Sequence, residues 1–502
     1  MQFVQNVPFI TIILSLFSGP LCSILDGKKA KRINLAVIWI VMLMSCAVLA
    51  FVMQSGTSYV YMMGHFPAPW GNEIRVGVLE AFMAVFFCII MLLCMMGGVY
   101  EREQKLEDTK QNLYYILVNL LLSSLLALIY TNDLFTAYVF VEINTISACG
   151  LIMIKQNGRT LEAATRYMIM SLMGSGLLLL GICFIYDLTG HLLMSNIQEQ
   201  VRILSQTGMY HMPLLVALGL MAVGLAIKSA LFPFHSWLPD AYGYSTVSSA
   251  AILSSLVSKG YVFLLVKIFF RVIGFDIVRD SKIMNILFVF GIAGMIMGSV
   301  SAIQENNIRR MIAYSSVAQI GYIYMGFGLG NTAGVIASLY HILSHAATKA
   351  LLFVAASGIT DASDNQTDFQ KLTGAGYRNK LAGIAFTAGS LSMIGIPMFC
   401  GFISKLLFAQ AGMENTYKMF PTLIALAIST ILNAVYFMKT VIRIYTPVSR
   451  KEIQKNGYRN ISIKEQPVKS VALILFIILN LILGLCSEPI VAALQSGLGM
   501  FA

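Results

Sequence analysis

Residues 214–240 read LLVALGLMAVGLAIKSALFPFHSWLPD, and this stretch decides how the rest of the chain is interpreted. It begins as an apolar helix, brings Lys228 into a membrane interior, and is then broken at Pro233 and Pro239. A charge within a span costs about 2.5–3.5 kcal/mol, and lipid cannot satisfy the backbone groups of an interrupted helix. Both features are tolerated around a polar cavity, which favours an ion pathway built on a discontinuous helix. The alternative is a lysine that reaches toward the interface, with Pro233 as an ordinary helix stop.

The composition is that of a polytopic membrane protein. Hydrophobic residues make up 58% of the 502 residues and charged residues only 11%, against about 25% in soluble domains. The net charge of +11 comes from lysines and arginines in short loops between apolar runs, a pattern that orients membrane helices. We therefore expect a multi-pass protein of the cell membrane that contacts the lipid bilayer and binds no nucleic acid.

The cysteines do not suggest a metal site or a cofactor. All eight lie in apolar runs, and none forms a CxxC pair, so structural zinc and cysteine-bound iron–sulfur clusters are not expected. The first apolar segment lacks a basic start and continues to Ile24, so we interpret it as a retained span.

Apolar runs of about 20 residues predict an all-α protein with about 14 transmembrane helices. Basic loops alternate along the chain, which predicts that they lie in the cytoplasm and that both termini lie outside. A turn-rich segment, PAPWGNEI at 67–74, suggests a small external hairpin. The expected spans are 4–24, 34–55, 76–99, 112–130, 134–154, 164–187, 213–229, 245–270, 284–303, 311–329, 332–358, 381–409, 421–445 and 470–496.

A second interruption echoes the first. The span 381–409 contains Gly395-Ile396-Pro397, with Lys405 just after it, and lies five helices beyond the break at Lys228. An odd offset places the two units in opposite orientations. Paired broken helices are typical of inverted-repeat transporters.

Several ionisable residues fall inside the predicted spans. Glu142, Lys228, Lys259 and Lys405 lie on separate helices, whereas one helix carries a file of three, which are His341, His345 and Lys349. The spacing i, i+4, i+8 keeps this file on one face, about 6 Å apart per step. A proton relay needs such a file, and a packing stripe does not.

Burial gives these residues their chemistry. A lysine away from water loses its preference for the charged form, and a nearby carboxylate restores it. Moving Glu142 toward or away from Lys228 would switch the lysine between holding and releasing a proton. The alternatives are a structural ion pair for Glu142, ordinary core histidines, and a Lys405 that reaches the interface. We expect His235, Trp237 and Asp240 to pack in a cytoplasmic loop, and we assign no role to Glu80, near a span end.

Five stretches carry these residues, namely DLFTAYVFVE (133–142), KSALFPFHSWLPDA (228–241), RRMIAYSSVAQIGY (309–322), YHILSHAATKALLF (340–353) and GIPMFCGFISK (395–405). Together they resemble the antiporter-like subunits shared by respiratory complex I, membrane-bound hydrogenases and the Mrp cation/proton antiporters. The length and the PAPWGNEI segment look closest to the Mrp D-type and related hydrogenase subunits.

The resemblance implies a fold of 14 helices with two inverted five-helix repeats and discontinuous helices 7 and 12. Residues 1–111 would hold helices 1–3, and 112–270 the first repeat, helices 4–8. Residues 284–445 would hold the second repeat, helices 9–13, and 446–502 a basic cytoplasmic loop and helix 14.

The resemblance also implies roles. Glu142 and Lys228 match the charge pair of a first half-channel, and Lys259 matches a connecting lysine. His341, His345 and Lys349 match a central relay, and Lys405 matches an exit lysine. One departure concerns the start of helix 8, where the family often has Pro-Val-Ser and this chain reads Tyr244-Ser-Thr-Val-Ser248. The missing proline affects the expected geometry of the first access route.

These observations favour a proton-translocating subunit of a multisubunit complex, with other membrane subunits as partners and no redox centre of its own. It would serve an Mrp-type cation/proton antiporter or a redox-driven pump of the hydrogenase or NADH dehydrogenase type, and transport of sodium stays open. One alternative is a haem enzyme that uses His341 and His345, which lacks a suitable partner histidine in another span. Another is a stand-alone secondary transporter of a small solute.

Overall fold

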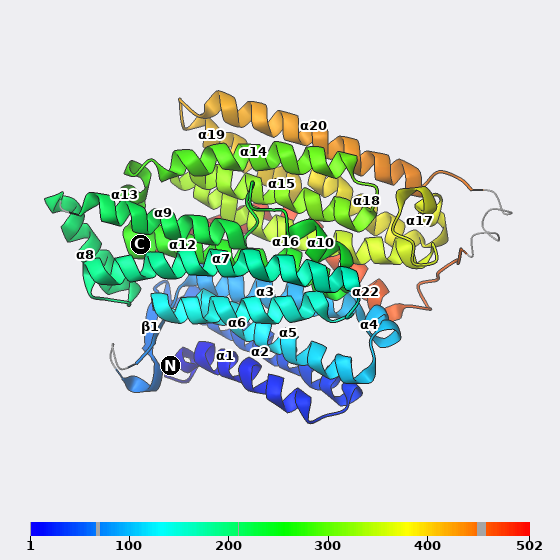
Figure 1. The fold of residues 1–502 in the computed structure, drawn as a ribbon, viewed down its shortest axis with the longest axis horizontal. Helices are drawn as coiled ribbons and strands as arrows, with labels where there is room; N and C mark the ends of the chain where they lie inside the picture. Colours follow the sequence, from blue (N-terminus) through cyan, green and yellow to red (C-terminus); the bar gives the residue numbers. More distant parts are fainter. Residues whose placement is uncertain (1, 67–70, 209, 449–457, 502) are drawn as a thin grey trace.

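The computed structural model describes residues 2–66, 71–208, 210–448 and 458–501. Long helices run side by side along the longest axis of the molecule (Figure 1). They are α1 (Gln2–Ser23), α2 (Gly27–Ser55), α3 (Val78–Gly97), α5 (Asp108–Tyr130), α6 (Leu134–Met153), α7 (Gly158–Thr189), α9 (His211–Lys228), α14 (Ile283–Gln304), α15 (Ile308–Gly328), α16 (Thr332–Asp361), α20 (Met419–Ile444) and α22 (Pro467–Leu485).

Shorter helices complete the bundle and cover its ends. They are α4 (Val99–Lys105), α8 (Met194–Thr207), α10 (Leu238–Tyr244), α11 (Val247–Ile252), α12 (Ser258–Lys267), α13 (Phe275–Asp280), α17 (Ala375–Arg378), α18 (Lys380–Ile394), α19 (Cys400–Met413) and α23 (Ser487–Gly499). Within the described residues, 11 helices are long and apolar enough to cross a membrane. The predicted polytopic helical class is therefore confirmed.

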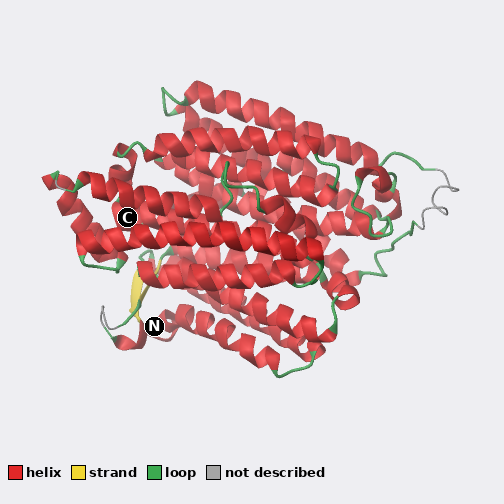
Figure 2. Ribbon diagram, in the orientation of Figure 1, coloured by secondary structure: helices red, strands yellow, loops and turns green. Residues whose placement is uncertain are grey.

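The small hairpin predicted around PAPWGNEI also forms. Strand β1 (Tyr59–Met62) pairs antiparallel with β2 (Glu73–Val76), and Figure 2 shows this pair at one end of an otherwise helical molecule. Residues 67–70 of the turn lie outside the described residues, as do residues 449–457 of the predicted basic loop before helix 14.

Both predicted breaks are present, and a third was missed. Helix α9 ends at Lys228, and α18 ends before Gly395, which has a left-handed φ of 92°. The expected single span 470–496 is instead two helices, α22 and α23, that meet near Cys486. Pro489 explains this error, because proline lacks an N–H and its ring clashes with the carbonyl four residues earlier.

The loop expected after the first break is shorter than predicted. The chain becomes helical again at Leu238, so Asp240 lies in α10, and Trp237, only 3% exposed, precedes its first turn. The expectation of a loop at Asp240 was wrong because Pro239 favours a helix start at the first positions of a helix. Helix 7 of the prediction thus consists of α9 and α10.

Helix 8 of the prediction contains two π-helical segments. The run from Val247 to Ile273 passes through α11, a π segment at Leu253–Val257, α12, and a second π segment at Ile268–Ile273. Such segments are rare and frequently mark functional sites. The first one ends directly before Lys259.

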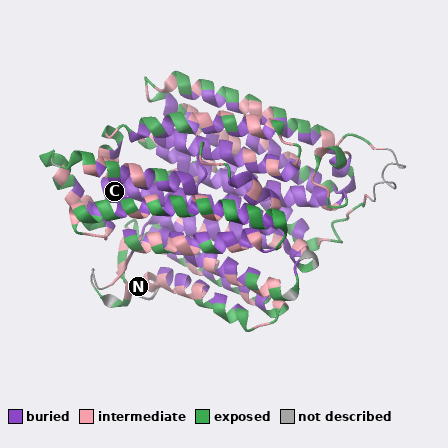
Figure 3. Cartoon of the chain, viewed as in Figure 1, coloured by how far each residue is buried: buried purple, intermediate pink, exposed green. Residues whose placement is uncertain are grey.

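Helix α16 forms the centre of the molecule. The apolar window that makes it a candidate span is entirely buried by other helices. Figure 3 shows buried residues gathered in the middle of the bundle and exposed residues on the outer helices. Apolar side chains such as Val289 of α14 and Ile431 of α20 are more than 60% exposed, as expected of helices that face lipid.

Candidate functional site: a buried line of charged side chains

Lys228 lies at the first helix break and is only 1% exposed. Its Nζ donates hydrogen bonds to Thr145 Oγ1 (2.8 Å) and Ser171 Oγ (3.2 Å). Glu142 Oε1 lies 3.8 Å from the same Nζ. The structure therefore brings the predicted pair together, and it adds two hydroxyl groups that sequence reasoning missed.

Close packing of α7 against α9 fixes this lysine. A Cβ on Gly174 would lie 2.8 Å from the backbone oxygen of Gly224 and 3.1 Å from Lys228 Cγ. Only glycine allows such a backbone approach. On the other side, the ring of Tyr261 lies 5.4 Å from the ammonium nitrogen. Because Tyr261 belongs to α12, it connects the pair to the helix that carries Lys259.

Lys259 is fully buried in α12. Its Nζ donates to the backbone oxygen of Ser254, inside the first π segment, and to Ser258 Oγ at 3.2 Å. Among the described residues no carboxylate forms an ion pair with it. A buried ammonium with only neutral partners is less stable than a paired one, which makes this group suited to giving up a proton.

The file on α16 is buried as predicted. The rings of His341 and His345 are stacked, with centroids 5.8 Å apart and an angle of 16° between planes. His341 Nδ1 lies 2.6 Å from Ser404 Oγ, whereas neither ring nitrogen of His345 has a hydrogen-bond partner among the described protein atoms. Buried polar atoms of this kind are commonly satisfied by water. Lys349 Nζ donates to Ser315 Oγ and to the backbone oxygen of Ile312.

Lys405 lies at the second helix break and points into it. Its Nζ donates to the backbone oxygen of Ile394, the last residue of α18, at 2.6 Å and to Thr430 Oγ1 at 2.8 Å. The next residue back, Ser404, contacts His341. These contacts tie Lys405 to the file rather than to the interface.

Serines of α15 join the two halves of this line. Ser254 Oγ lies 3.2 Å from Ser316 Oγ, and the adjacent Ser315 accepts from Lys349. Hydrogen-bonded groups thus lead from the Lys259 region to the α16 file. The signal in the sequence was the SS pair at 315–316 within an otherwise apolar run.

Sequence reasoning also missed charges at one end of helix 8. Glu80, to which no role was assigned, is fully buried, forms an ion pair with Arg271, and accepts a hydrogen bond from Gly77 N at 3.0 Å. Nearby, Lys267 donates to the backbone oxygens of Leu128 and Thr131. Because the periodicity of an apolar helix hides which charges meet across it, only the tertiary contacts identify this pair.

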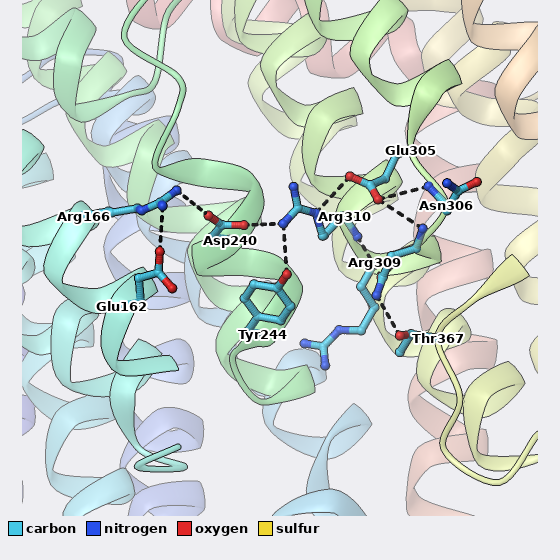
Figure 4. Close-up of polar contacts among 10 residues, drawn as sticks. Glu162, Arg166, Asp240, Tyr244, Glu305, Asn306, Arg309, Arg310 and Thr367 are labelled. Atoms are coloured by element: carbon cyan, nitrogen blue, oxygen red, sulfur yellow. Dashed lines mark hydrogen bonds and ion pairs between the residues drawn. The ribbon is translucent and has the colours of Figure 1, made fainter. Parts of the chain in front are cut away.

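A second charged network lies at the opposite end of the bundle, which we call the basic end because the predicted basic loops lie there. Arg310 Nη1 lies 2.5 Å from Asp240 Oδ1, and Arg310 Nε lies 2.9 Å from Glu305 Oε2. Asp240 also pairs with Arg166, as Figure 4 shows. The network fastens α10, the second half of the broken helix, to α7 and α15.

Metal binding finds no support in the side-chain arrangement. In the described part of the chain, no three His, Cys, Asp or Glu side chains gather in a way that could hold a metal ion. What the site offers is a series of proton donors and acceptors inside an apolar bundle.

The class that this fold and site define is an antiporter-like membrane protein that works within a complex. The chain belongs to the NADH:quinone oxidoreductase/Mrp antiporter transmembrane family, which matches residues 131–432. A relative from Desulforudis audaxviator, NADH-quinone oxidoreductase subunit N, is 31% identical over 449 residues, covering 88% of this chain and 86% of that one. A D-type Na(+)/H(+) antiporter subunit from Alkalihalophilus pseudofirmus is 26% identical over 443 residues, covering 88% and 85%.

Solved structures share the fold. A chain of the archaeal membrane-bound sulfane sulfur reductase aligns with a TM-score of 0.86 and 24% identity over 100% of this chain and 98% of that chain. A chain of the Mrp complex from Dietzia sp. DQ12-45-1b gives 0.86 and 22% over 99% and 97%. One from respiratory complex I of Thermus thermophilus gives 0.73 and 21% over 98% and 100%.

Proposed function

We propose that this protein is a proton-translocating subunit of a larger membrane complex. The observation that carries the proposal is the buried line of titratable groups from Glu142 and Lys228, through Lys259, to the α16 file and Lys405. The two relatives described above are named as subunits, which supports other membrane subunits as partners and disfavours a stand-alone solute transporter.

The proposed mechanism begins at the Glu142–Lys228 pair. Glu142 near Lys228 stabilises the ammonium, and withdrawal of the carboxylate leaves the charge in an apolar bundle, which drives the proton away. The proton passes to Lys259, and Tyr261 and trapped water lie on the way. This makes movement of one carboxylate a gate for the whole line.

The later steps use the α16 file. From Lys259 the proton moves past Ser254, Ser316 and Ser315 to Lys349. His345 and His341 carry it on toward Ser404, and Lys405 releases it at the second break. Only N–H and O–H bonds form and break, and each donor is regenerated by the next proton.

We also propose that the chain crosses the membrane 14 times, in two inverted five-helix repeats. Besides the 11 candidate spans, crossings would be made by the helix 8 run (Val247–Ile273), by α15, and by α18 with α19. Both ends of the chain lie at the end of the bundle that carries β1 (Figure 1), which supports an even number.

The proposed division of the chain follows from these crossings. Residues 1–111 hold helices 1–3, 112–270 the first repeat, 284–445 the second, and 446–502 the basic loop and helix 14. The positive-inside rule places the basic end in the cytoplasm and both termini outside.

The experiment uses the complete complex, purified through a tag on this protein and reconstituted in vesicles. Proton movement is followed after addition of an electron donor with quinone, and separately after a sodium gradient is imposed. The first arm detects a redox-driven pump and the second a cation/proton antiporter. Lys259→Ala should abolish the response in whichever arm is active, and an unchanged response would refute the proposed relay.

A further inference from the structure

A polar cavity of about 240 Å³ opens at the basic end of the molecule. Its walls come from both proposed repeats and from α4, which follows α3. The charged side chains that line it are Glu101, Lys155, Arg159, Arg309 and Asp361. The relay described above leaves this cavity without a role.

Glu101 connects the cavity to helix 8. One carboxylate oxygen lies 2.9 Å from Lys155 Nζ, and the side chain is 9% exposed. The other oxygen accepts a hydrogen bond of 2.5 Å from the backbone N–H of Val247, the first residue of α11. The free N–H groups at a helix start favour a negative charge there. A carboxylate therefore lies between water and the helix that carries Lys259.

Hydroxyl groups continue from this point along helix 8. Thr246 Oγ1 lies 2.7 Å from Ser249 Oγ, and one and a half turns later Ser254 lies 3.2 Å from Ser316. The distance from Val247 to Lys259 is about 18 Å along a helix. Buried hydroxyls cost free energy unless they have partners, and they offer sites for bridging water. They are Thr246, Ser248, Ser249, Ser254, Ser255 and Ser258, and all are at most 2% exposed.

We infer that Glu101 collects protons from the aqueous phase at the basic end and passes them along helix 8 to Lys259. The inference rests on the proposed function, because Lys259 is the acceptor. A hydronium ion or a protonated buffer gives its proton to a Glu101 oxygen, and the buffer leaves as its conjugate base. The carboxyl O–H then donates to water beside Thr246 and Ser249, and the carboxylate is restored.

The charges around Glu101 suit repeated loading. Lys155 contacts it, Arg102 follows it on α4, and Arg309 and Arg159 line the same cavity, where Asp361 is the other carboxylate among the described lining residues. This surplus of positive charge returns Glu101 to the ionised form once its proton has moved on. The carboxylate is then ready for the next proton.

The alternative role for Glu101 is purely structural, as a cap for helix 8, and Glu101→Gln separates the two. Glutamine keeps an oxygen that accepts from Val247 N–H, but it cannot bind a proton. In vesicles at low buffer concentration, we expect this variant of the complete complex to translocate protons about tenfold more slowly or worse. A high concentration of 2-(N-morpholino)ethanesulfonate, a mobile buffer that does not cross the bilayer, should restore the rate by delivering protons directly.

Two variants serve as controls, with flux calibrated by acid pulses at each buffer concentration. Glu162→Gln removes an exposed carboxylate that pairs with Arg166 at the same end but does not line the cavity, and it should behave like wild type. Lys259→Ala should stay inactive at every buffer concentration.

The outcomes separate the two levels of the argument. A Glu101→Gln complex that is as fast as wild type at low buffer, or one whose loss buffer does not restore, overturns the inference. If Lys259→Ala is inactive in that case, the proposed relay stands and only the intake route fails. If Lys259→Ala translocates normally, the proposed function itself fails.

Discussion

Replacing His341 and His345 by alanine, singly and together, tests whether α16 carries protons. The rings are stacked with centroids 5.8 Å apart. His341 contacts Ser404 beside Lys405, while both ring nitrogens of His345 lack a protein partner among the described residues. His345 is thus free to exchange a proton with water on either side.

The structure sets the expected magnitudes. One water with two hydrogen bonds of about 2.8 Å spans about 5.6 Å, which matches the ring separation, so each single variant should lose only about threefold in rate. Without both rings, water must bridge the about 12 Å of helix between positions 341 and 349. We expect the double variant to be about tenfold slower than the two single effects multiplied, a coupling of about 1.4 kcal/mol.

The assay is proton translocation by the complete complex in vesicles, measured for wild type, both single variants and the double variant. Equal content of this protein on a native gel serves as the assembly control. If the double variant shows only the product of two small effects, the histidines are ordinary core residues and the proton route lies elsewhere.

The remaining predictions concern the lysines and the buried ion pair. Glu142→Gln and Lys228→Ala should each slow translocation about a hundredfold in an assembled complex, and retained pumping in the vesicle assay would contradict the gate. Lys259→Arg should not restore activity, because arginine keeps its charge and cannot release a proton; a fully active arginine variant would indicate a structural charge. Arg271→Met should destabilise the protein by about 3–5 kcal/mol, because it leaves Glu80 buried without its partner. Thermal unfolding in detergent measures this loss, and the double variant Glu80→Leu/Arg271→Met should recover most of it, unless Arg271 contributes mainly through other contacts.

Much of the architecture could be predicted from the sequence because each span is a local property. A run of apolar residues long enough to cross a bilayer becomes a helix whatever surrounds it, since lipid offers no other partner for the backbone. The breaks at Lys228 and Gly395 were readable for the same reason, because proline and glycine act on their own turn. The i, i+4, i+8 spacing likewise placed His341, His345 and Lys349 on one face before any contact was known.

What only the tertiary structure decided is which groups meet. The sequence paired Lys228 with Glu142, but the contacts with Thr145 and Ser171 depend on how α6 and α7 pack against α9. The Glu80–Arg271 pair joins positions 191 residues apart, and the contact of Glu101 with Val247 N joins α4 to the start of helix 8. Helix periodicity gives a side chain its direction around one axis, whereas its partner depends on the rotation and depth of a second helix, which is set by side-chain packing along the whole interface.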